Sequence, residues 1–231
     1  NGYSFSITKK VAAGSGLGSS ASSSAAAVVA LNKLLGSPFS RHELIPFAMK
    51  GESLASGAEH ADNVAPSILG GFTLVQSYEP LRVVNLHYPE DLVATIVHPH
   101  VEVKTADSKR ILRQSIPLKT AITQWANVGG LVAGLAQEDF ELIGHSLQDV
   151  VAEPTRSMLI PMYEQVKILS KKMGALGCSI SGSGPSIFML SDTMNIAKSL
   201  AESLKDLYMD NLISCDVYLS KINKMGCQVI Q

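Results

Sequence analysis

The sequence is poor in charged side chains and carries almost no net charge. Charged residues make up 17% of the 231 residues, and 19 Lys and Arg stand against 20 Asp and Glu, for a formal net charge of −1. A protein that holds a nucleic-acid backbone needs an excess of positive charge on its surface. The composition contains no such excess and no run of like charge, so nucleic acid is not an expected partner.

Cysteines and long apolar runs are also scarce. The three cysteines, Cys178, Cys215 and Cys227, are far apart and form no CxxC pair, which predicts reduced thiols rather than disulfides or a zinc site. No apolar run approaches the ~20 residues that cross a bilayer, and no signal-peptide pattern is visible. We therefore expect a cytoplasmic protein without a membrane partner.

The sequence has no initiator Met at its start, and a glycine-rich loop follows after only a short segment. Because so little scaffold precedes that loop, we expect further residues ahead of Asn1. With 46% hydrophobic residues, the chain is long enough for one large domain or two modest ones.

Local patterns predict a mixture of helices and strands, with helices packed on a sheet and two halves that meet near residue 90. Pro46 lies early in the second helix and predicts a later regular start, and residues 60–71 are expected to form a loop. Trp125 is expected in the core. The expected strands are 3–11, 72–78, 82–86, 92–98, 175–181, 186–190 and 212–219. The expected helices are 20–35, one from a capping box at Ser40 toward Glu59, most of 106–172 with breaks near 117, 138 and 153–154, and 194–208.

Residues 14–24 (GSGLGSSASSS) form a glycine–serine loop that runs into a helix. Gly14, Gly16 and Gly18 allow the backbone to turn its N–H groups toward one point, where the positive helix N-terminus also acts. The following serines add hydroxyl groups. No Lys follows as in a Walker loop, and Ser19 replaces the last Gly of a dinucleotide loop. The pattern predicts a polyphosphate site; the alternative, a flexible linker, conflicts with the Ala-rich helix that follows.

Phosphoryl transfer requires a carboxylate to hold Mg²⁺, and Glu52 is the candidate because its neighbours are small. Glu59 is its competitor, and a solvated helix glutamate is the open alternative. His60 and Asn63 belong to a polar cluster that suits either turn chemistry or a polar substrate. A second glycine run, residues 182–186, is by itself typical of a hairpin turn.

Together, residues 13–21 and 180–186 resemble the second and third motifs of the GHMP kinases, a family of ATP-dependent small-molecule kinases. The resemblance implies an α+β, two-domain fold. A ribosomal-protein-S5-like nucleotide domain would comprise residues 1–88, and a ferredoxin-like α/β-sandwich C-terminal domain residues 89–231. The family's first motif, with N-terminal strands, lies upstream and is missing from these residues.

Within the family, residues 60–67, 70–72 and 153–156 resemble the branch that phosphorylates L-homoserine, and 226–229 resemble its closing strand. The resemblance implies a homodimer that uses ATP and Mg²⁺ and makes O-phospho-L-homoserine for threonine biosynthesis. Ser20 and Glu52 match the catalytic Mg²⁺ ligands. The implied substrate residues are His60, Asn63, Lys109, Arg110 and Arg156. The implied ATP-binding residues are Ala13, Gly14, Ser15, Gly16, Leu17, Gly18, Ser19, Ser20, Gly182, Ser183 and Gly184.

One substitution and two alternatives remain open. The family usually has Arg where Lys109 stands, so either Lys109 or Arg110 meets the substrate carboxylate. The alternatives are a GHMP kinase for mevalonate or a cytidyl-erythritol, and a nucleotide-binding regulator without turnover. Residues 60–67 and 153–156 distinguish a homoserine kinase from a kinase for those other substrates. The presence of both Ser20 and Glu52 argues against a regulator without turnover.

Overall fold

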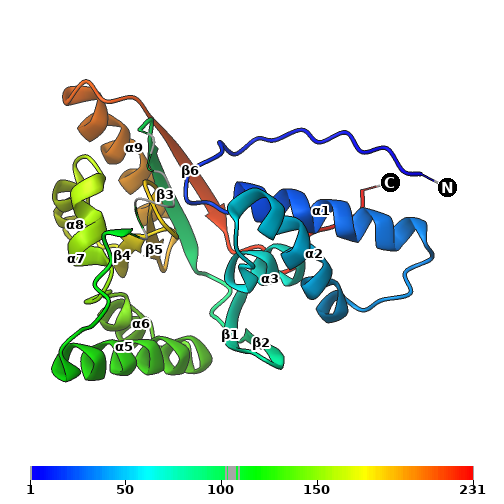
Figure 1. The fold of residues 1–231 in the computed structure, drawn as a ribbon. Helices are drawn as coiled ribbons and strands as arrows, with labels where there is room; N and C mark the ends of the chain where they lie inside the picture. The colour runs from blue at the N-terminus through cyan, green and yellow to red at the C-terminus, as the bar shows by residue number, and fades with distance from the viewer. Residues whose placement is uncertain (1, 102, 104–107, 109, 231) are drawn as a thin grey trace. The chain divides into compact units, whose positions relative to one another are not determined.

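The computed structural model describes residues 2–101, 103, 108 and 110–230 (Figure 1). The chain forms two compact units: one contains Asn1–Ala13, Gly18–Leu86 and Asn223–Gln231, and the other contains Gly14–Leu17 and His87–Ile222. The glycine–serine loop is therefore divided between the units at Gly18. The expected domain division after residue 88 stays a prediction.

The first unit packs three helices and a hairpin (Figure 1). Its elements are α1 (Ser19–Leu34), α2 (Arg41–Ser56), α3 (Ala61–Leu69), β1 (Phe72–Tyr78) and β2 (Leu81–Leu86). The capping box at Ser40 is confirmed, because Ser40 and Glu43 cap each other's backbone N–H groups. Pro46 lies inside α2 and does not delay its start, contrary to expectation. The proline lacks one backbone donor, whereas the cap and the buried face hold the first turn.

Small side chains allow α1 and α2 to approach each other closely. Ala21 and Ala25 of α1 are buried, as is Ala48 of α2. A Cβ added to Gly51 would lie 3.1 Å from the Ser24 hydroxyl oxygen. The small residues around Glu52 therefore serve helix packing.

Residues 60–71 are not the expected loop, because residues 61–69 form α3. Ala61, Val64, Ala65 and Ile68 are fully buried, and their spacing is that of one helix face. The polar residues and Pro66 drew attention to turn chemistry and concealed this period.

Residues 3–11 and 226–229 were expected as strands and are not. A strand needs a partner for its backbone groups, and neither segment has one in the described part of the chain. The C-terminal segment instead packs by single contacts. The Gly71 N–H donates to the Asn223 carbonyl, and the Cys227 N–H donates to that of Ser67, both at 2.8 Å.

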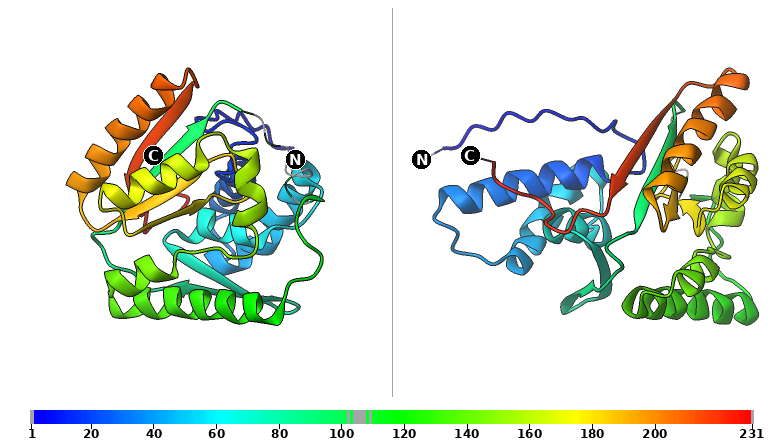
Figure 2. Two further views of the ribbon diagram at one scale, coloured as in Figure 1. Left: turned by 90° about the vertical axis from the view of Figure 1, so that its left-hand side faces the viewer. Right: turned by 180° about the vertical axis from the view of Figure 1, so that it is seen from behind.

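The second unit is a four-stranded antiparallel sheet in the order β4-β5-β3-β6 with helices. Helices α8 and α9 contribute Val166, Leu200 and Tyr208 to a core on one face of the sheet (Figure 2, left). The strands are β3 (Val93–Pro99), β4 (Gly177–Ile180), β5 (Ile187–Ser191) and β6 (Cys215–Lys221). The helices are α5 (Leu118–Gln137), α6 (Phe140–Ser146), α7 (Glu153–Arg156), a 3-10 turn (Ser157–Leu159), α8 (Tyr163–Lys172) and α9 (Met194–Asp210).

Trp125 is not in the core, as was expected, but is 65% exposed on α5. The buried residues of α5 are Ala121, Gly134 and Leu135, and Ala121 lies only one turn before Trp125. A lone aromatic residue in a helical run does not indicate which side of the helix meets a neighbour.

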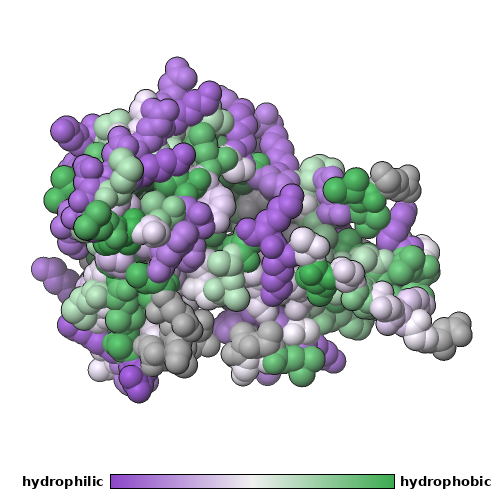
Figure 3. Space-filling view, turned by 90° about the horizontal axis from the view of Figure 1, so that it is seen from above, coloured by the Kyte–Doolittle hydropathy of each residue, from purple (hydrophilic) through white to green (hydrophobic). Residues whose placement is uncertain are grey.

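None of the described helices combines the length and apolar character that crossing a membrane requires. On the face shown in Figure 3, hydrophobic side chains are interspersed with hydrophilic ones.

Candidate functional site

The second glycine run is a tight connection between β4 and β5, as its pattern suggested. The Ser181 N–H donates to the Ser186 carbonyl at 2.8 Å, and the Gly184 N–H donates to the Ser181 carbonyl at 2.9 Å. Gly182 and Gly184 have φ values of 57° and 80°, which favour glycine. We call residues 181–186 the hairpin loop.

The first part of the glycine–serine loop, Gly14–Leu17, lies directly against the hairpin loop. The Ser181 hydroxyl donates to the Gly16 carbonyl at 2.9 Å, and the Ser186 N–H donates to the Ser15 carbonyl at 3.2 Å. A Cβ on Gly16 would lie 2.5 Å from the Ser181 carbonyl oxygen and 2.8 Å from that of Gly184. Only glycine fits here, so the two glycine motifs form one continuous backbone surface.

Two residues distant in sequence support the hairpin loop. The buried Ser108 hydroxyl donates to the Ser183 carbonyl at 2.9 Å. Arg156 donates through Nη1 to the Gly182 carbonyl at 3.1 Å and through Nε to the Ser108 carbonyl at 3.4 Å. Neither Ser108 nor Ser181 is among the predicted site residues, because a serine that supports a backbone carbonyl carries no local sequence signal.

In the other unit, α1 begins without a side-chain cap. Gly18 is its N-cap with φ 68°, and no side chain accepts a hydrogen bond there. The Ser19 hydroxyl donates to the Val11 carbonyl at 2.9 Å, so this hydroxyl supports the backbone. The backbone N–H groups and the positive dipole end of a helix start without a side-chain cap favour an anion.

Glu52 is only 4% exposed, so the solvated-helix alternative for it is wrong. Its competitor Glu59 is exposed and follows the end of α2. Ser20 lies on α1 one turn before Ser24, which contacts α2 beside Gly51. A buried carboxylate and a hydroxyl on two packed helices are oxygen donors of the kind that Mg²⁺ prefers.

Among the residues that the structure describes, no three His, Cys, Asp or Glu side chains gather into a group that could hold a metal. A cation at Ser20 and Glu52 would therefore need further oxygen ligands from a bound phosphate or from water.

The predicted substrate residues belong to both units. His60 is the N-cap of α3, with Nδ1 3.7 Å from Asp62 Oδ1. Asn63 lies beside the start of α1, because its Oδ1 would be 3.9 Å from a Cβ on Gly18. Arg110 is exposed in the second unit. Lys109 lies outside the described residues, so the choice between Lys109 and Arg110 stays open.

Known proteins resemble this chain over nearly its whole length. Residues 1–71 match the family model described as GHMP kinases N terminal domain, and residues 131–209 match GHMP kinases C terminal. A homoserine kinase of Chlorobium phaeobacteroides is 47% identical over 97% of this chain and 71% of its own length. A crystal structure of homoserine kinase from Cytophaga hutchinsonii is 54% identical, with a TM-score of 0.93, over 96% of this chain and 70% of that one.

The chain belongs to the homoserine kinases, a branch of the GHMP kinase family. The expected resemblance and the α+β, two-domain kinase fold are confirmed. The L. major mevalonate kinase structure, at 17% identity and a TM-score of 0.70, shares the fold alone.

In this member of the homoserine kinases, His98 also contacts the hairpin loop. Its Nδ1 lies 3.2 Å from the Ser186 hydroxyl, and its side chain is buried in β3. Burial lowers the pKa of His98, the nearby His100 lowers it further, and Asp216 opposes the shift. His100 itself pairs with Asp216 at 3.0 Å.

The lowered pKa of His98 predicts a loss of stability in acid. The unfolded chain, with a histidine pKa near 6.5, binds the proton more readily than the folded chain. The contribution of neutral, buried His98 to the free energy of unfolding is therefore complete above pH 6.5. It is lost as the pH falls toward the pKa of His98 in the folded chain. Urea unfolding across this pH range should show a weaker acid dependence for His98→Gln than for wild type, whereas His145→Gln, at an exposed position, should retain it. Equal acid dependence in His98→Gln and wild type would contradict this account.

Proposed function

We propose that this protein transfers the γ-phosphoryl group of ATP to the side-chain hydroxyl of L-homoserine, giving O-phospho-L-homoserine for threonine biosynthesis. The observation that carries the proposal is the likeness to homoserine kinases over 96–99% of this chain, with both glycine motifs in contact. In the reaction, the bond from the γ-phosphorus to the bridging oxygen breaks and a bond to the homoserine oxygen forms, while the hydroxyl proton leaves.

We assign the nucleotide phosphates to the joined glycine motifs of the second unit, and the family resemblance adds the first residues of α1 to the same role. Backbone N–H groups supply most of the donors, since the Ser19 hydroxyl is occupied by Val11. The residues assigned to ATP binding by the family resemblance are Ala13, Gly14, Ser15, Gly16, Leu17, Gly18, Ser19, Ser20, Gly182, Ser183 and Gly184. Such preorganised donors stabilise charge on the transferring group without reorganising during the reaction.

Ser20 and Glu52 are the residues that would hold Mg²⁺, which when bound neutralises charge on the phosphates. Burial of Glu52 keeps its carboxylate in place on α2. We assign no general base among the described residues, because a loose transition state requires little proton removal before transfer.

L-Homoserine binds to His60, Asn63 and Arg156, together with Lys109 or Arg110. Arg156 uses Nε and Nη1 for backbone carbonyls, and its other N–H groups suit the substrate carboxylate. This assignment gives Arg156 two partners, the hairpin loop and the substrate. We further propose that the enzyme is a cytoplasmic homodimer, with residues 1–88 as its nucleotide domain and 89–231 as its C-terminal domain.

The proposed substrate is tested with the full-length protein, ATP and Mg²⁺. We expect ADP release with L-homoserine and none above background with mevalonate or a cytidyl-erythritol, because residues 60–67 and 153–156 follow the homoserine branch. Turnover of another alcohol but not of homoserine would refute the substrate. Nucleotide binding without any turnover would instead favour the regulator.

Gly16→Ala should weaken ATP binding, because its Cβ would push the two glycine motifs apart. Gly14→Ala is the matched control, since Gly14 has a similar φ of 74° and nothing within 4 Å of an added Cβ. We expect the KM for ATP to rise at least about tenfold more in Gly16→Ala, which corresponds to ~1.4 kcal/mol. Similar KM values in the two variants would refute the importance of this contact.

Glu52→Gln should lower kcat by about a hundredfold or more, because the amide cannot neutralise a cation as a carboxylate does. The exposed Glu59→Gln is the control and should retain kcat. Steady-state kinetics at several Mg²⁺ concentrations, with circular dichroism to verify folding, measure the effect. Near-normal turnover of Glu52→Gln would remove Glu52 from the metal site.

A further inference from the structure

A buried carboxylate begins the short helix that carries Arg156. Glu153 is 7% exposed at the start of α7, and its Oε1 pairs with Nζ of Lys167 on α8. Its other oxygen, Oε2, is also buried. Burial raises the pKa of the Tyr163 hydroxyl, and the Glu153 carboxylate lies close enough to raise that pKa further. An acid in such surroundings is costly unless it is paired, so this ion pair has a strong influence on where α7 lies.

Lys167 extends to this carboxylate from a helix that is packed on the sheet. It lies on α8, whose Tyr163 and Val166 are buried in the sheet core, and Nζ is 5.9 Å from the centre of the Tyr163 ring. Burial opposes the charged form of Lys167, but the hydrogen bond and the charge of Glu153 outweigh it and raise the pKa of Lys167. Lys167 therefore keeps its positive charge beside Glu153 at neutral pH.

Helix α7 is one turn long and cannot hold its shape alone. Asp149 Oδ1 accepts hydrogen bonds from the N–H groups of Val151 and Ala152, both at 2.8 Å, just before the helix. Glu153 then ties the first residue of the turn to α8, and Arg156 is its last residue. The direction of the Arg156 guanidinium thus depends on both anchors.

We propose that Glu153 is a positioning residue: through Lys167 it fixes α7 so that Arg156 holds the Gly182 carbonyl of the hairpin loop. Glu153 itself touches neither nucleotide nor substrate in this role. The inference rests on the proposed function, because the hairpin loop is there assigned to ATP and Arg156 to the homoserine carboxylate.

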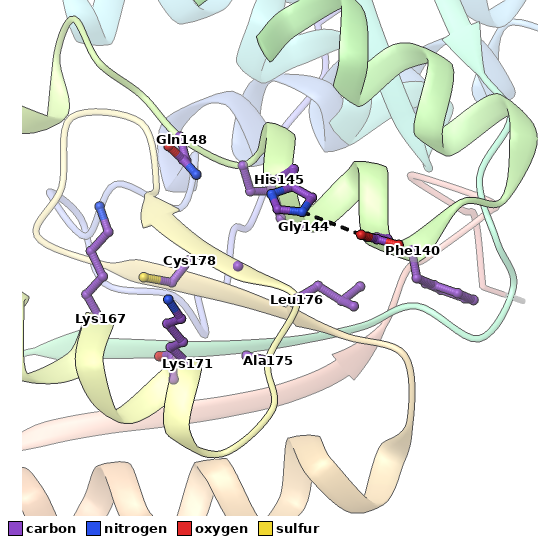
Figure 4. Close-up of a pocket in the computed structure, with 13 residues that line it drawn as sticks. Phe140, Gly144, His145, Gln148, Lys167, Lys171, Ala175, Leu176 and Cys178 are labelled. Carbon is purple, nitrogen blue, oxygen red and sulfur yellow. Dashed lines mark ion pairs between the residues drawn. The ribbon is translucent and has the colours of Figure 1, made fainter.

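The chain offers a matched control on the same helix. Lys167 and Lys171 lie one turn apart on α8 and both line a pocket of about 530 Å³ (Figure 4). Lys167 forms an ion pair with Glu153. Lys171 forms no ion pair with any other residue that the structure describes. Loss of charge at the two positions therefore differs chiefly in the Glu153 pair.

The test compares Glu153→Gln, Lys167→Met, Lys167→Arg and Lys171→Met in the full-length protein, well below each melting temperature. For Glu153→Gln and Lys167→Met we expect kcat/KM for homoserine to fall about tenfold or more and Kd for ATP to rise. Lys167→Arg, which retains the charge, and Lys171→Met should stay within about twofold of wild type.

Combination with Arg156→Lys distinguishes positioning from general stability. If Glu153 acts through Arg156, Glu153→Gln should add little to the loss in Arg156→Lys, since the two residues form one unit. Multiplied losses, or a lower melting temperature with unchanged Kd and kcat/KM, would overturn the proposal. Because Lys167 is half exposed, Lys167→Met tests the same pair should Glu153→Gln fail to fold.

ATP binding separates this inference from the proposed function. If the wild type binds ATP but does not phosphorylate homoserine, the substrate assignment fails. The Kd for ATP of the variants still decides the role of Glu153: a rise in Glu153→Gln and Lys167→Met, but not in Lys171→Met, supports it. Equal Kd values for ATP in the wild type and in these three variants refute the role of Glu153.

Discussion

The contact of Gly16 with the hairpin loop is the constraint on which the rest of the candidate site depends. It joins backbone to backbone, and the space for a side chain is absent, since a Cβ would lie 2.5 Å from the Ser181 carbonyl oxygen. Glycine is required for steric reasons and for its positive φ. Because the contact places two sets of peptide groups side by side, it provides a polar surface without charged side chains, in keeping with the low charge of the protein.

The surrounding groups hold this backbone surface in position. Ser108 and Arg156 bind carbonyls of the hairpin loop, and His98 lies behind it at Ser186. Arg156 in turn lies on a single helical turn that Glu153 ties to α8. Ser108 and Arg156 act on carbonyl groups of the hairpin loop, and His98 acts on the Ser186 hydroxyl, so residues distant in sequence fix the position of this loop. In the other unit, helix packing buries the Glu52 side chain on α2 and so restricts where its carboxylate can lie.

Local patterns predicted the elements whose signals are local. Helix α1 follows from an Ala-rich run and α2 from the capping box at Ser40; the strand β1 was predicted with its observed limits. The predictions that were wrong depend on which other segment of the chain a residue packs against or pairs with. Residues 3–11 have strand character but no paired strand in the described part of the chain, and Trp125 is exposed on α5. The period of α3 was present in the sequence and was missed because its polar residues resemble a turn.

The sequence by itself determined the kinds of groups available: two glycine runs, a helix that follows the first of them, one carboxylate among small residues, and motifs of the homoserine kinase branch. These depend on neighbouring residues or on the chemistry of a side chain, so they can be recognised without coordinates. Only the tertiary structure decided that Gly16 meets Ser181, that Glu52 is buried, and that Arg156 and Glu153 bind Gly182 and Lys167. Such contacts join segments far apart in the chain, and their geometry depends on the path of the whole backbone rather than on any local pattern.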